Sequence, residues 1–520
     1  MDRELINEAL DHYKAGRLPD AHNICQSILM ERPGDPMALQ LLALILSARL
    51  QYNIAIDLMR RAIAVAPNVA DFHNNLGETL FRAGRAKEAA VCYRSAIRLN
   101  PKMWLAYNNL GRCMAASNKP AEAQAAYRKV IELNPELPQV HLNLATLVLG
   151  EGKIDEAIAL LERAVQLKPD YVNAVGALGG LLSTKGELDR ALDFHNRVLA
   201  LAPENPSAHV NKSLVLLLQG KYEQAWEDYE WRWKLPGLQE RNFGKPRWAG
   251  ENIRGKTILV HAEQGFGDTI QFLRYVPMVA ERGAKVIVEC QDSLKLLAQS
   301  VEGAASVVVR GEAPGEFDLH APMASLPGIF KTTMATIPAR IPYLHAPHER
   351  LNRWRERVAK EKRFKVGLVW AGSPTNANDR NRTVGLGLMS DIARVPGVAF
   401  YGLQKGEAAG QLAKYEDLEI VDLSAELNDF ADTAAALEQM DLLISVDTSV
   451  VHLAGAIGRP TWVILHYSPP WRWHLEGEES PWYPSVRLFR QGPAMKWEEP
   501  IERVVEALVS RIKAEAAKAR

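Results

Sequence analysis

One strand-to-helix passage carries polar side chains suited to binding an anion. Residues 441–445, with the apolar run 442–444 at their centre, are expected to form a buried strand, and Asp447 follows it. Thr448 opens the helix expected at 449–457, and His452 lies one turn further along on the same face. The free amides and the positive dipole end of a helix N-terminus favour negative charge. We therefore expect this point of the chain to hold a diphosphate.

A second turn places a carboxylate beside glycine. Segment 263–269 follows the strand expected at 256–261, and within it Asp268 comes directly after Gly267. As a helix N-cap, a position where Asp is strongly preferred, this residue would need no substrate nearby. As a catalytic group it would lie at the carboxyl end of a parallel strand, where α/β proteins bind ligands. The two roles are compatible.

Two α/β units are expected to position these turns, because strands and helices alternate after the connector 235–255. The first unit has strands at 256–261, 285–289 and 306–309 and helices at 268–282 and 294–299. A charged linker helix at 349–365 leads to the second, with strands at 364–370, 398–403, 441–445 and 461–465 and helices at 407–415, 431–439 and 449–457. Two such Rossmann-like sheets create a cleft between the carboxyl ends of their strands.

Several other chemistries lack their motifs in this sequence. Neither sheet opens with a complete GxGxxG, and no GxxxxGK[ST] is present, which disfavours a dehydrogenase and a kinase. No Asp-x-Asp is placed to bridge a metal and a diphosphate, and the 13 histidines show no ligand spacing. We expect no metal or other cofactor and activity in the presence of a chelator.

A period of 34 residues organises the first half of the chain. A small residue recurs seven times at this spacing, at Ala21, Ala55, Ala89, Ala123, Ala157, Ala191 and Ala225. A glycine column comprises Gly16, Gly84, Gly152, Gly186 and Gly220, with Leu50 and Asn118 at the two remaining places. Small residues let antiparallel helices approach, and glycine turns the chain between them. Each period is therefore predicted to be a helical hairpin.

The residue pattern of these hairpins, as in 76–101, resembles the tetratricopeptide repeat, with seven repeats across 2–239. The resemblance implies a superhelix whose inner groove is lined by the first helix of each hairpin. An asparagine recurs there, and its amide can both donate to and accept from the backbone of an extended peptide. The predicted peptide-binding residues are Asn75, Asn109, Asn143 and Asn211. Alternatively, this asparagine is a consensus residue of such repeats that needs no ligand.

The motif Asp-Thr-x-x-x-His-Leu-Ala-x-Ala-x-Gly-x-Pro at 447–460 resembles the donor-site signature of heptosyltransferase-like glycosyltransferases. Those are two-domain GT-B enzymes that use nucleotide sugars. The resemblance implies that Asp447, Thr448 and His452 bind the donor. It also implies that Asp268, within a matching Gly-Asp pair, is the catalytic base that removes the acceptor proton as the nucleotide diphosphate leaves.

Two further segments contain residues that the same resemblance suggests for donor binding. In the loop 371–382 the family contacts donor phosphates with a hydroxyl and a cation, which suggests Ser373 and Arg382, with Arg380 as a substitute. The lysine of the lipopolysaccharide enzymes is not evident there. At the end of the next strand, Gln404 and Lys405 are expected near the nucleotide ribose. A surface-loop interpretation stays open for Arg380 and Lys405.

An aromatic stretch begins within the strand at 461–465, with Trp462, and continues through 466–473 to 482–483. A sugar platform or lid is one interpretation of 466–473 and 482–483. We favour packing between loop and core, because indole rings bury large areas, and assign no site residue there.

The amino-acid composition limits the classes of partner and the compartment that we expect for the protein. The 520 residues contain 62 Lys+Arg and 62 Asp+Glu, so the net charge is +0 and no field selects nucleic acid. The four cysteines are scattered, which fits a reducing compartment. The sequence contains no apolar run of the roughly 18 residues that a membrane span needs. These features predict a cytoplasmic protein with no transmembrane segment.

These observations predict an α-solenoid followed by an α/β GT-B architecture, two Rossmann-like domains facing across a cleft. The predicted domains are 1–239 for the repeats, 240–348 for the acceptor side with the base, and 349–520 for the linker helix and donor side. The predicted function is a glycosyltransferase that moves a sugar from a nucleotide sugar to a protein held in the repeat groove.

The nearest functional analogies to this plan are the O-linked N-acetylglucosamine transferases and the bacterial flagellin-modifying transferases, and they rest on architecture alone. Two alternatives stay open. One is a heptosyltransferase-like enzyme acting on a lipopolysaccharide or other glycan. The other is a non-catalytic tetratricopeptide scaffold.

Overall fold

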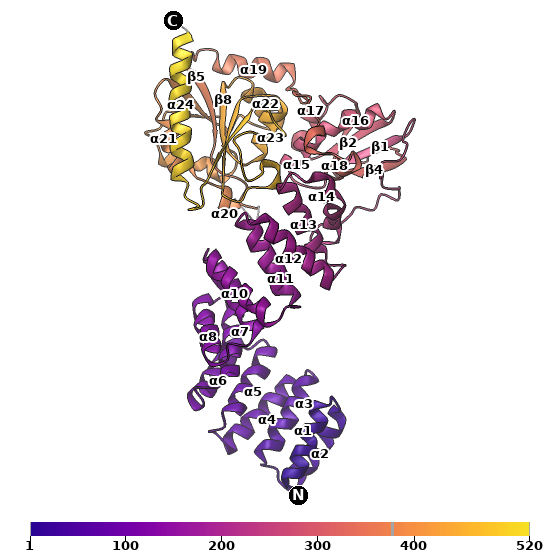
Figure 1. Ribbon diagram of the computed structural model, residues 1–520, viewed down its shortest axis with the longest axis vertical. Coiled ribbons are helices and arrows are strands. Elements are labelled where there is room, and N and C mark those ends of the chain that lie inside the picture. Colours follow the sequence, from indigo (N-terminus) through magenta and orange to yellow (C-terminus); the bar gives the residue numbers. More distant parts are fainter. Residues whose placement is uncertain (1, 376–378, 519–520) are drawn as a thin grey trace. The chain divides into compact units, whose positions relative to one another are not determined.

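The computed structural model describes residues 2–375 and 379–518 (Figure 1). The chain divides into two compact units, with the boundary between Leu181 and Leu182. Among the described residues, no helix combines the length and the apolar character needed to cross a membrane.

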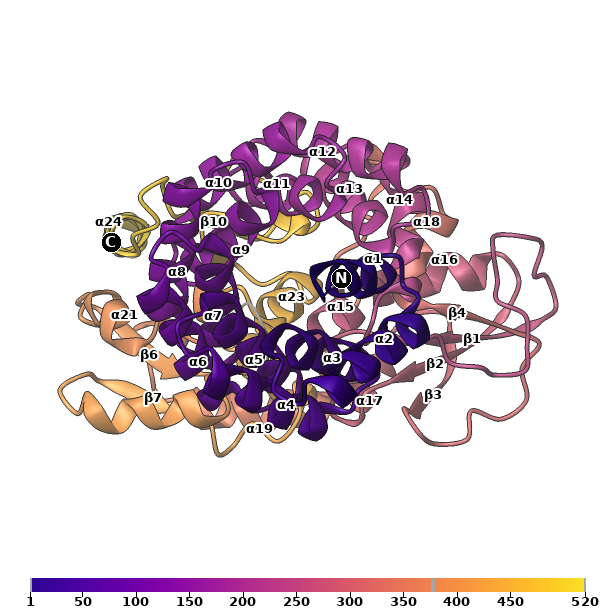
Figure 2. The ribbon, with the colours of Figure 1, turned by 90° about the horizontal axis from the view of Figure 1, so that it is seen from below.

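The first unit is a row of antiparallel helices. The helices are α1 (Asp2–Lys14), α2 (Leu18–Glu31), α3 (Pro36–Ala48), α4 (Tyr52–Val65), α5 (Ala70–Arg82), α6 (Ala86–Leu99), α7 (Trp104–Ala116), α8 (Pro120–Leu133), α9 (Pro138–Leu149), α10 (Ile154–Leu167) and most of α11 (Val172–Thr184). Figure 2 shows α4 to α10 following a curved path. The second unit continues the series with α12 (Leu188–Leu201), α13 (Pro206–Leu218) and α14 (Tyr222–Tyr229). The described residues thus contain the seven predicted hairpins.

Small residues let the helices of each hairpin pack closely. Ala55 and Ala89 are completely buried. A Cβ atom added to Gly77 would lie 2.6 Å from the Tyr93 ring, and one on Gly111 would lie equally close to Tyr127. Small residues at these helix crossings therefore mark places where a larger side chain would push two helices apart.

The glycine column supplies left-handed backbone between helices. Gly84 has φ +77° and Gly152 has the same value. Leu50 and Asn118, which interrupt the column, adopt φ 63° and 56°. L-residues pay a steric cost in this region that glycine avoids.

The first sheet contains four parallel strands in the described residues, in the order β3-β2-β1-β4. They are β1 (Thr257–His261), β2 (Lys285–Cys290), β3 (Ala304–Val309) and β4 (Leu319–Pro322). The helix expected at 268–282 begins earlier and is broken into α15 (Phe266–Phe272), η2 (Leu273–Tyr275) and α16 (Val276–Glu281). The short α17 (Lys295–Ala298) follows β2. The break coincides with Pro277 in the first turn of α16, because proline lacks the amide that would continue the helix.

The second sheet is entirely parallel in the described residues, in the order β10-β9-β8-β5-β6-β7. Its strands are β5 (Phe364–Val369), β6 (Val398–Gly402), β7 (Ile420–Asp422), β8 (Leu442–Val446), β9 (Thr461–Leu465) and β10 (Val486–Arg490). Its helices are α21 (Leu386–Ala393), α22 (Phe430–Leu437), α23 (Ser449–Ala456) and α24 (Glu498–Lys518), and α19 (His348–Val358) precedes it. In Figure 1, α21 and α24 lie on one side of the sheet and α22 and α23 on the other. The helix expected at 407–415 is instead a 3-10 helix, η6 (Glu407–Lys414).

The left-handed turn positions predict opposite changes in stability for two substitutions. Leu50 is 71% exposed, so Leu50→Gly loses little packing and should stabilise the protein by about 1 kcal/mol. Gly84→Ala, where an added Cβ meets nothing within 4 Å, should destabilise it by a similar amount. Urea denaturation measures both changes. Two shifts of the same sign would contradict this account of the turns.

A buried histidine in α12 predicts acid sensitivity. Neither ring nitrogen of His195 has a hydrogen-bond partner in the described residues, and burial lowers the pKa of His195 from 6.5 to about 4. Between pH 6.5 and pH 4 the His195 side chain is protonated in the unfolded chain but neutral in the folded protein. The free energy of unfolding therefore falls by about 1 kcal/mol per pH unit as the pH drops through this range. Unfolding of His195→Leu, followed at several pH values, should show a shallower loss than the natural protein. An identical slope would refute the assignment.

Candidate active site

The two sheets meet where α15 packs against α23. Gly267, in the first turn of α15, lies so close to α23 that an added Cβ would be 2.8 Å from Cδ2 of His452. Glycine is needed here because the imidazole occupies the place of a side chain. The two turns expected to carry chemistry, one from each sheet, are therefore neighbours.

Asp268 occupies the third position of α15, not the N-cap that the sequence suggested as its alternative role. Gly265 is the N-cap, and its amide donates to Oδ2 of Asp268 at 3.2 Å. The other oxygen, Oδ1, accepts a hydrogen bond from Nη2 of Arg472. The Asp268 side chain is 23% exposed and the Arg472 side chain is 13% exposed, so this ion pair is mostly shielded from water.

Arg472 belongs to a short 3-10 helix, η7 (Trp471–Trp473), which follows β9. Its Nε donates to Oε1 of Gln271 in α15, so the guanidinium holds two side chains of the first sheet's leading helix. Although burial works against the cation, the charge of Asp268 keeps the pKa of Arg472 raised. The predicted gap between the Asp268 and α23 turns is thus occupied by a cationic side chain.

Asp447 is 5% exposed and is tied to the same 3-10 helix. Its Oδ1 accepts a hydrogen bond from Nε1 of Trp473 at 3.0 Å. Burial raises the pKa of Asp447, and the positive charges of Arg472 and Arg382 oppose that rise. The Trp473 hydrogen bond and, after it, the two cations therefore favour the ionised form of Asp447.

His452 lies beneath Trp473. The two rings stack with centroids 5.4 Å apart, and Nδ1 lies 3.0 Å from the Tyr483 hydroxyl. Burial, with Arg472 and Arg274 nearby, holds the pKa of His452 well below its ordinary value, so the imidazole is neutral at neutral pH. Asp447 and His452 together fix Trp473, and through it the position of Arg472.

Thr448 is the N-cap of α23, as the sequence predicts, with extended backbone. Its carbonyl accepts from the amide of Val451. Its hydroxyl lies 3.4 Å from that of Ser445. The first turn of α23 therefore follows Asp447 directly, and its free amides can bind an anion.

The loop after β5 contributes Arg382. Its Nε donates to Oδ1 of Asp379 at 3.2 Å. Burial, and then the charge of Arg382, lower the pKa of His466 to about 4. Arg380 is exposed, and the exposed hydroxyls of Ser373 and Thr375 lie 2.8 Å apart. Within the loop singled out from the sequence, residues 376–378 lie outside the described residues.

Gln404 and Lys405 lie beyond the carboxyl end of β6, as predicted, but their polar groups bond within the fold. Oε1 of Gln404 accepts hydrogen bonds from the amides of Trp370 and Ala371, at 3.0 and 2.9 Å. Nζ of Lys405 donates to the carbonyl of Ser424 at 2.8 Å. In this structure Gln404 ties the ends of β5 and β6 together.

Three of the four predicted asparagines bond to side chains within the repeats. Nδ2 of the buried Asn109 donates to Oδ1 of Asn74 in the preceding repeat at 3.0 Å. Asn75 accepts from Asn74 at 3.3 Å, and Asn143 accepts from Gln139 at 2.8 Å. Asn211 is half-buried in α13. The Asn109 bond stabilises the packing of one repeat on the next, which is a role that needs no peptide.

Sequence reasoning missed Arg472. The expectation of packing for the aromatic stretch agrees with the burial of Trp471, Trp473, Trp482 and Tyr483. The same stretch nevertheless carries the guanidinium that joins both turns. An arginine flanked by two tryptophans was the available signal, because buried cations need partners.

A metal centre has no evident ligand set in the described part of the chain. Residues 2–375 and 379–518 contain no group of three or more His, Cys, Asp or Glu side chains that could hold a metal ion.

Family models match both halves. Residues 80–147, 114–182 and 148–209 match one tetratricopeptide repeat model, and residues 41–92 match another. Residues 397–499 match the model of glycosyltransferase family 9 (heptosyltransferase). The match to the glycosyltransferase model contains Asp447, Thr448, His452 and Arg472, whereas Asp268 lies outside it.

Among known proteins, the chain is similar to protein FlbA of Caulobacter vibrioides, with 29% identity over 327 residues. The alignment covers 57% of this chain and 54% of FlbA, so the chain spans about half the length of that relative. Solved structures similar to it include pilF of Pseudomonas aeruginosa, with 22% identity, TM-score 0.37 and coverage of 40% of this chain and 94% of that one. A thermophilic TPR protein of Thermus thermophilus has 22% identity, TM-score 0.30 and coverage of 35% and 99%.

The contact between Gly267 and His452 generates a prediction on stability. Gly267→Ala should destabilise the protein by about 1 to 3 kcal/mol, because the added methyl group overlaps the imidazole. In a His452→Ala background the same change should cost nothing, since the clash is gone and alanine favours the helix. Denaturant unfolding of the four proteins measures the difference. An equal loss in both backgrounds would show that the two turns are not in contact.

Proposed function

We propose, from the premise that the chain joins tetratricopeptide repeats to a family 9 glycosyltransferase domain, that it transfers a sugar from a nucleotide sugar to an acceptor protein recruited by the repeats. The observation that carries this proposal is the convergence of Asp268, Arg472 and the N-terminus of α23 at the junction of the two sheets. A carboxylate, a cation and a set of helix amides are the groups that such a transfer uses.

On the donor side, the leaving diphosphate binds at the first turn of α23, with Thr448 as the N-cap. Arg472, with Arg382 nearby, offsets the negative charge that builds on the leaving group. A guanidinium suits phosphate oxygens because its planar N–H groups can donate in pairs. The loop 371–382 contains no lysine that could pair with the diphosphate. Arg472 supplies the positive charge instead, and no metal ion is required.

Asp447 and His452 act by positioning Arg472. Asp447 accepts from Trp473, and His452 stacks on the same indole, so both hold the 3-10 helix that carries the guanidinium. Their burial, at 5% and 6% exposure, fits support of the site better than broad contact with a ligand.

On the acceptor side, Asp268 is the general base. When the diphosphate attracts Arg472, the Asp268 carboxylate loses its partner and becomes available to a hydroxyl. The acceptor oxygen then forms a bond to the anomeric carbon while the bond from that carbon to the diphosphate oxygen breaks. The electron pair of the broken bond stays on the diphosphate, and the hydroxyl proton moves to Asp268.

The proposal predicts distinct losses for the two residues. Asp268→Asn should lower sugar transfer at least about 100-fold, because the amide cannot take the proton, while binding of a nucleoside diphosphate persists. Arg472→Met should weaken that binding as well as transfer. The measurement is incubation of the purified chain with a panel of nucleotide sugars, with product detected by mass spectrometry and with a chelator in a parallel sample.

Arg487→Gln is a matched control, because Arg487 is an exposed arginine paired with Glu478 on the same sheet. It should transfer like the natural protein, and the chelator should leave transfer unchanged. Near-normal transfer by Asp268→Asn would remove that residue from the mechanism. Loss of transfer with the chelator would overturn the metal-independent scheme.

A further inference from the structure

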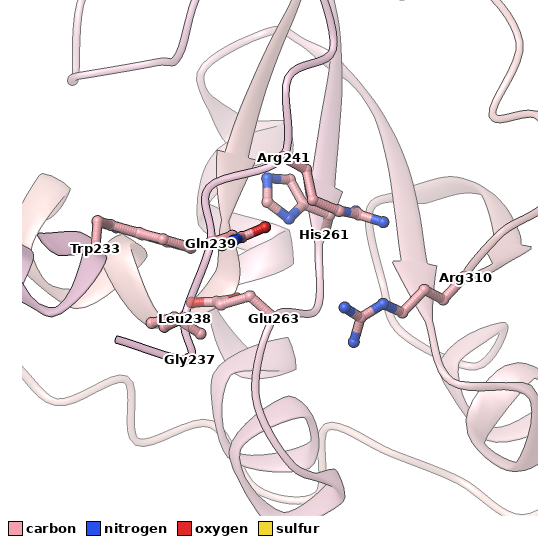
Figure 3. Close-up of a pocket in the computed structure, with 8 residues that line it drawn as sticks. All are labelled: Trp233, Gly237, Leu238, Gln239, Arg241, His261, Glu263 and Arg310. Atoms are coloured by element: carbon pink, nitrogen blue, oxygen red, sulfur yellow. The ribbon is translucent and has the colours of Figure 1, made fainter. Parts of the chain in front are cut away.

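A polar cavity lies at the carboxyl end of the first sheet. It has a volume of about 400 Å³ (Figure 3). His261 and Glu263 come from the end of β1, and Arg310 follows β3 directly. Arg241 comes from the connector between the repeats and the sheet, and Trp233 comes from the 3-10 helix η1 (Glu230–Lys234). We call this cavity the Arg310 pocket.

The Arg310 pocket contains one arginine without an acidic partner among the described residues. Burial and then the nearby guanidinium of Arg241, with Arg247 and Arg310 among the other causes, lower the pKa of His261 to about 2, so the imidazole is neutral. Arg241 is already neutralised by two hydrogen bonds to the buried Glu289, at 3.2 and 2.6 Å. In the described residues Arg310 has no carboxylate within 4.0 Å, which leaves one guanidinium open at the cavity.

A buried carboxyl oxygen in the same cavity lacks a partner. Oε1 of Glu263 accepts from the amide of Ala324 at 3.0 Å and from Nη2 of Arg232 at 3.4 Å. The other oxygen, Oε2, accepts no hydrogen bond in the described residues, and the Glu263 side chain is only 6% exposed. Buried polar atoms are rarely left unsatisfied, so a hydrogen-bond donor from a ligand fits this place.

One wall of the cavity is a fixed aromatic ring. Nε1 of Trp233 donates to Glu230 at 3.2 Å. The guanidinium groups of Arg232 and Arg247 lie 4.8 and 5.4 Å from the Trp233 ring centre. The indole is therefore held in place before any ligand binds, which lowers the entropic cost of using it as a contact surface.

We propose that the Arg310 pocket binds a ligand that carries a carboxylate with hydroxyl or amide hydrogens beside it. The carboxylate pairs with Arg310, one neighbouring hydrogen is donated to Oε2 of Glu263, and an apolar edge of the ligand lies on Trp233. In Figure 3 the guanidinium of Arg310 extends towards Glu263, whose carboxyl end points away from it, towards Trp233 and Leu238. Acidic monosaccharides and acidic segments of a protein both present this chemistry.

A doubly charged phosphate suits the cavity less well. Only one lining guanidinium is open in the part of the chain that the structure describes, and the Glu263 carboxyl would face the second phosphate charge. A monoanion with hydrogen-bond donors satisfies Arg310 and Glu263 together.

The link to catalysis rests on the proposed function. Glu263 comes from the segment between β1 and α15, and Asp268 lies in the first turn of α15, so the same connection carries the pocket residue and the proposed base.

Calorimetric titration of the full chain tests the proposal with two matched pairs of probes. Glucuronate is compared with glucose, and N-acetylglutamate with N-acetylglutamine. At least one carboxylate probe should bind about tenfold more tightly than its uncharged partner, and Arg310→Gln should abolish that preference. Arg340→Gln, which removes an exposed arginine paired with Glu302 in the same region, should leave it intact. Stronger binding of glucuronate identifies a sugar source, and stronger binding of N-acetylglutamate identifies a protein source.

Three results would overturn the proposal: no saturable binding of either carboxylate, equal binding of charged and uncharged probes, or the same affinities in Arg310→Gln and Arg340→Gln. Sugar transfer is measured on the same preparations. Transfer without carboxylate binding would refute the pocket alone, and carboxylate binding without transfer would refute the proposed function alone.

Discussion

A buried guanidinium joins the two sheets, and the rest of the candidate site depends on it. Arg472 pairs with Asp268 on the first sheet's leading helix while its own 3-10 helix belongs to the second sheet. An unpaired cation in this place would be costly, so the carboxylates and amides around it must stay in position. The position of Arg472 also depends on Trp473, the next residue in the chain. Asp447 holds the Trp473 indole by a hydrogen bond, and His452 holds it by ring stacking.

The close packing of α15 and α23 sets where Arg472 can act. Gly267 allows the helices to approach, and the neutral His452 ring fills the space between them. The same principle governs the repeats, where glycine lies against tyrosine at the hairpin crossings. In both halves of the chain a missing side chain on one element makes room for a ring on its partner.

Much of this architecture was predictable because it leaves a periodic or local trace. The 34-residue period predicted every hairpin, and apolar runs predicted β1, β5 and β8 at nearly their observed bounds. Short edge strands such as β7 were missed because three residues carry too little pattern. Asp268 and Asp447 were selected by local motif, but their bridge was not. Arg472 is 204 residues from Asp268 in sequence, and only packing brings them together.

The central claim is that a donor diphosphate and Asp268 compete for Arg472. The most direct measurement is the affinity for a panel of nucleoside diphosphates, determined by calorimetry in the natural protein, Asp268→Asn, Arg472→Met and the double variant. The account predicts that Asp268→Asn tightens binding several-fold and that this gain vanishes when Arg472 is absent. A gain of the same size in the Arg472→Met background, or weaker binding in Asp268→Asn alone, would contradict it.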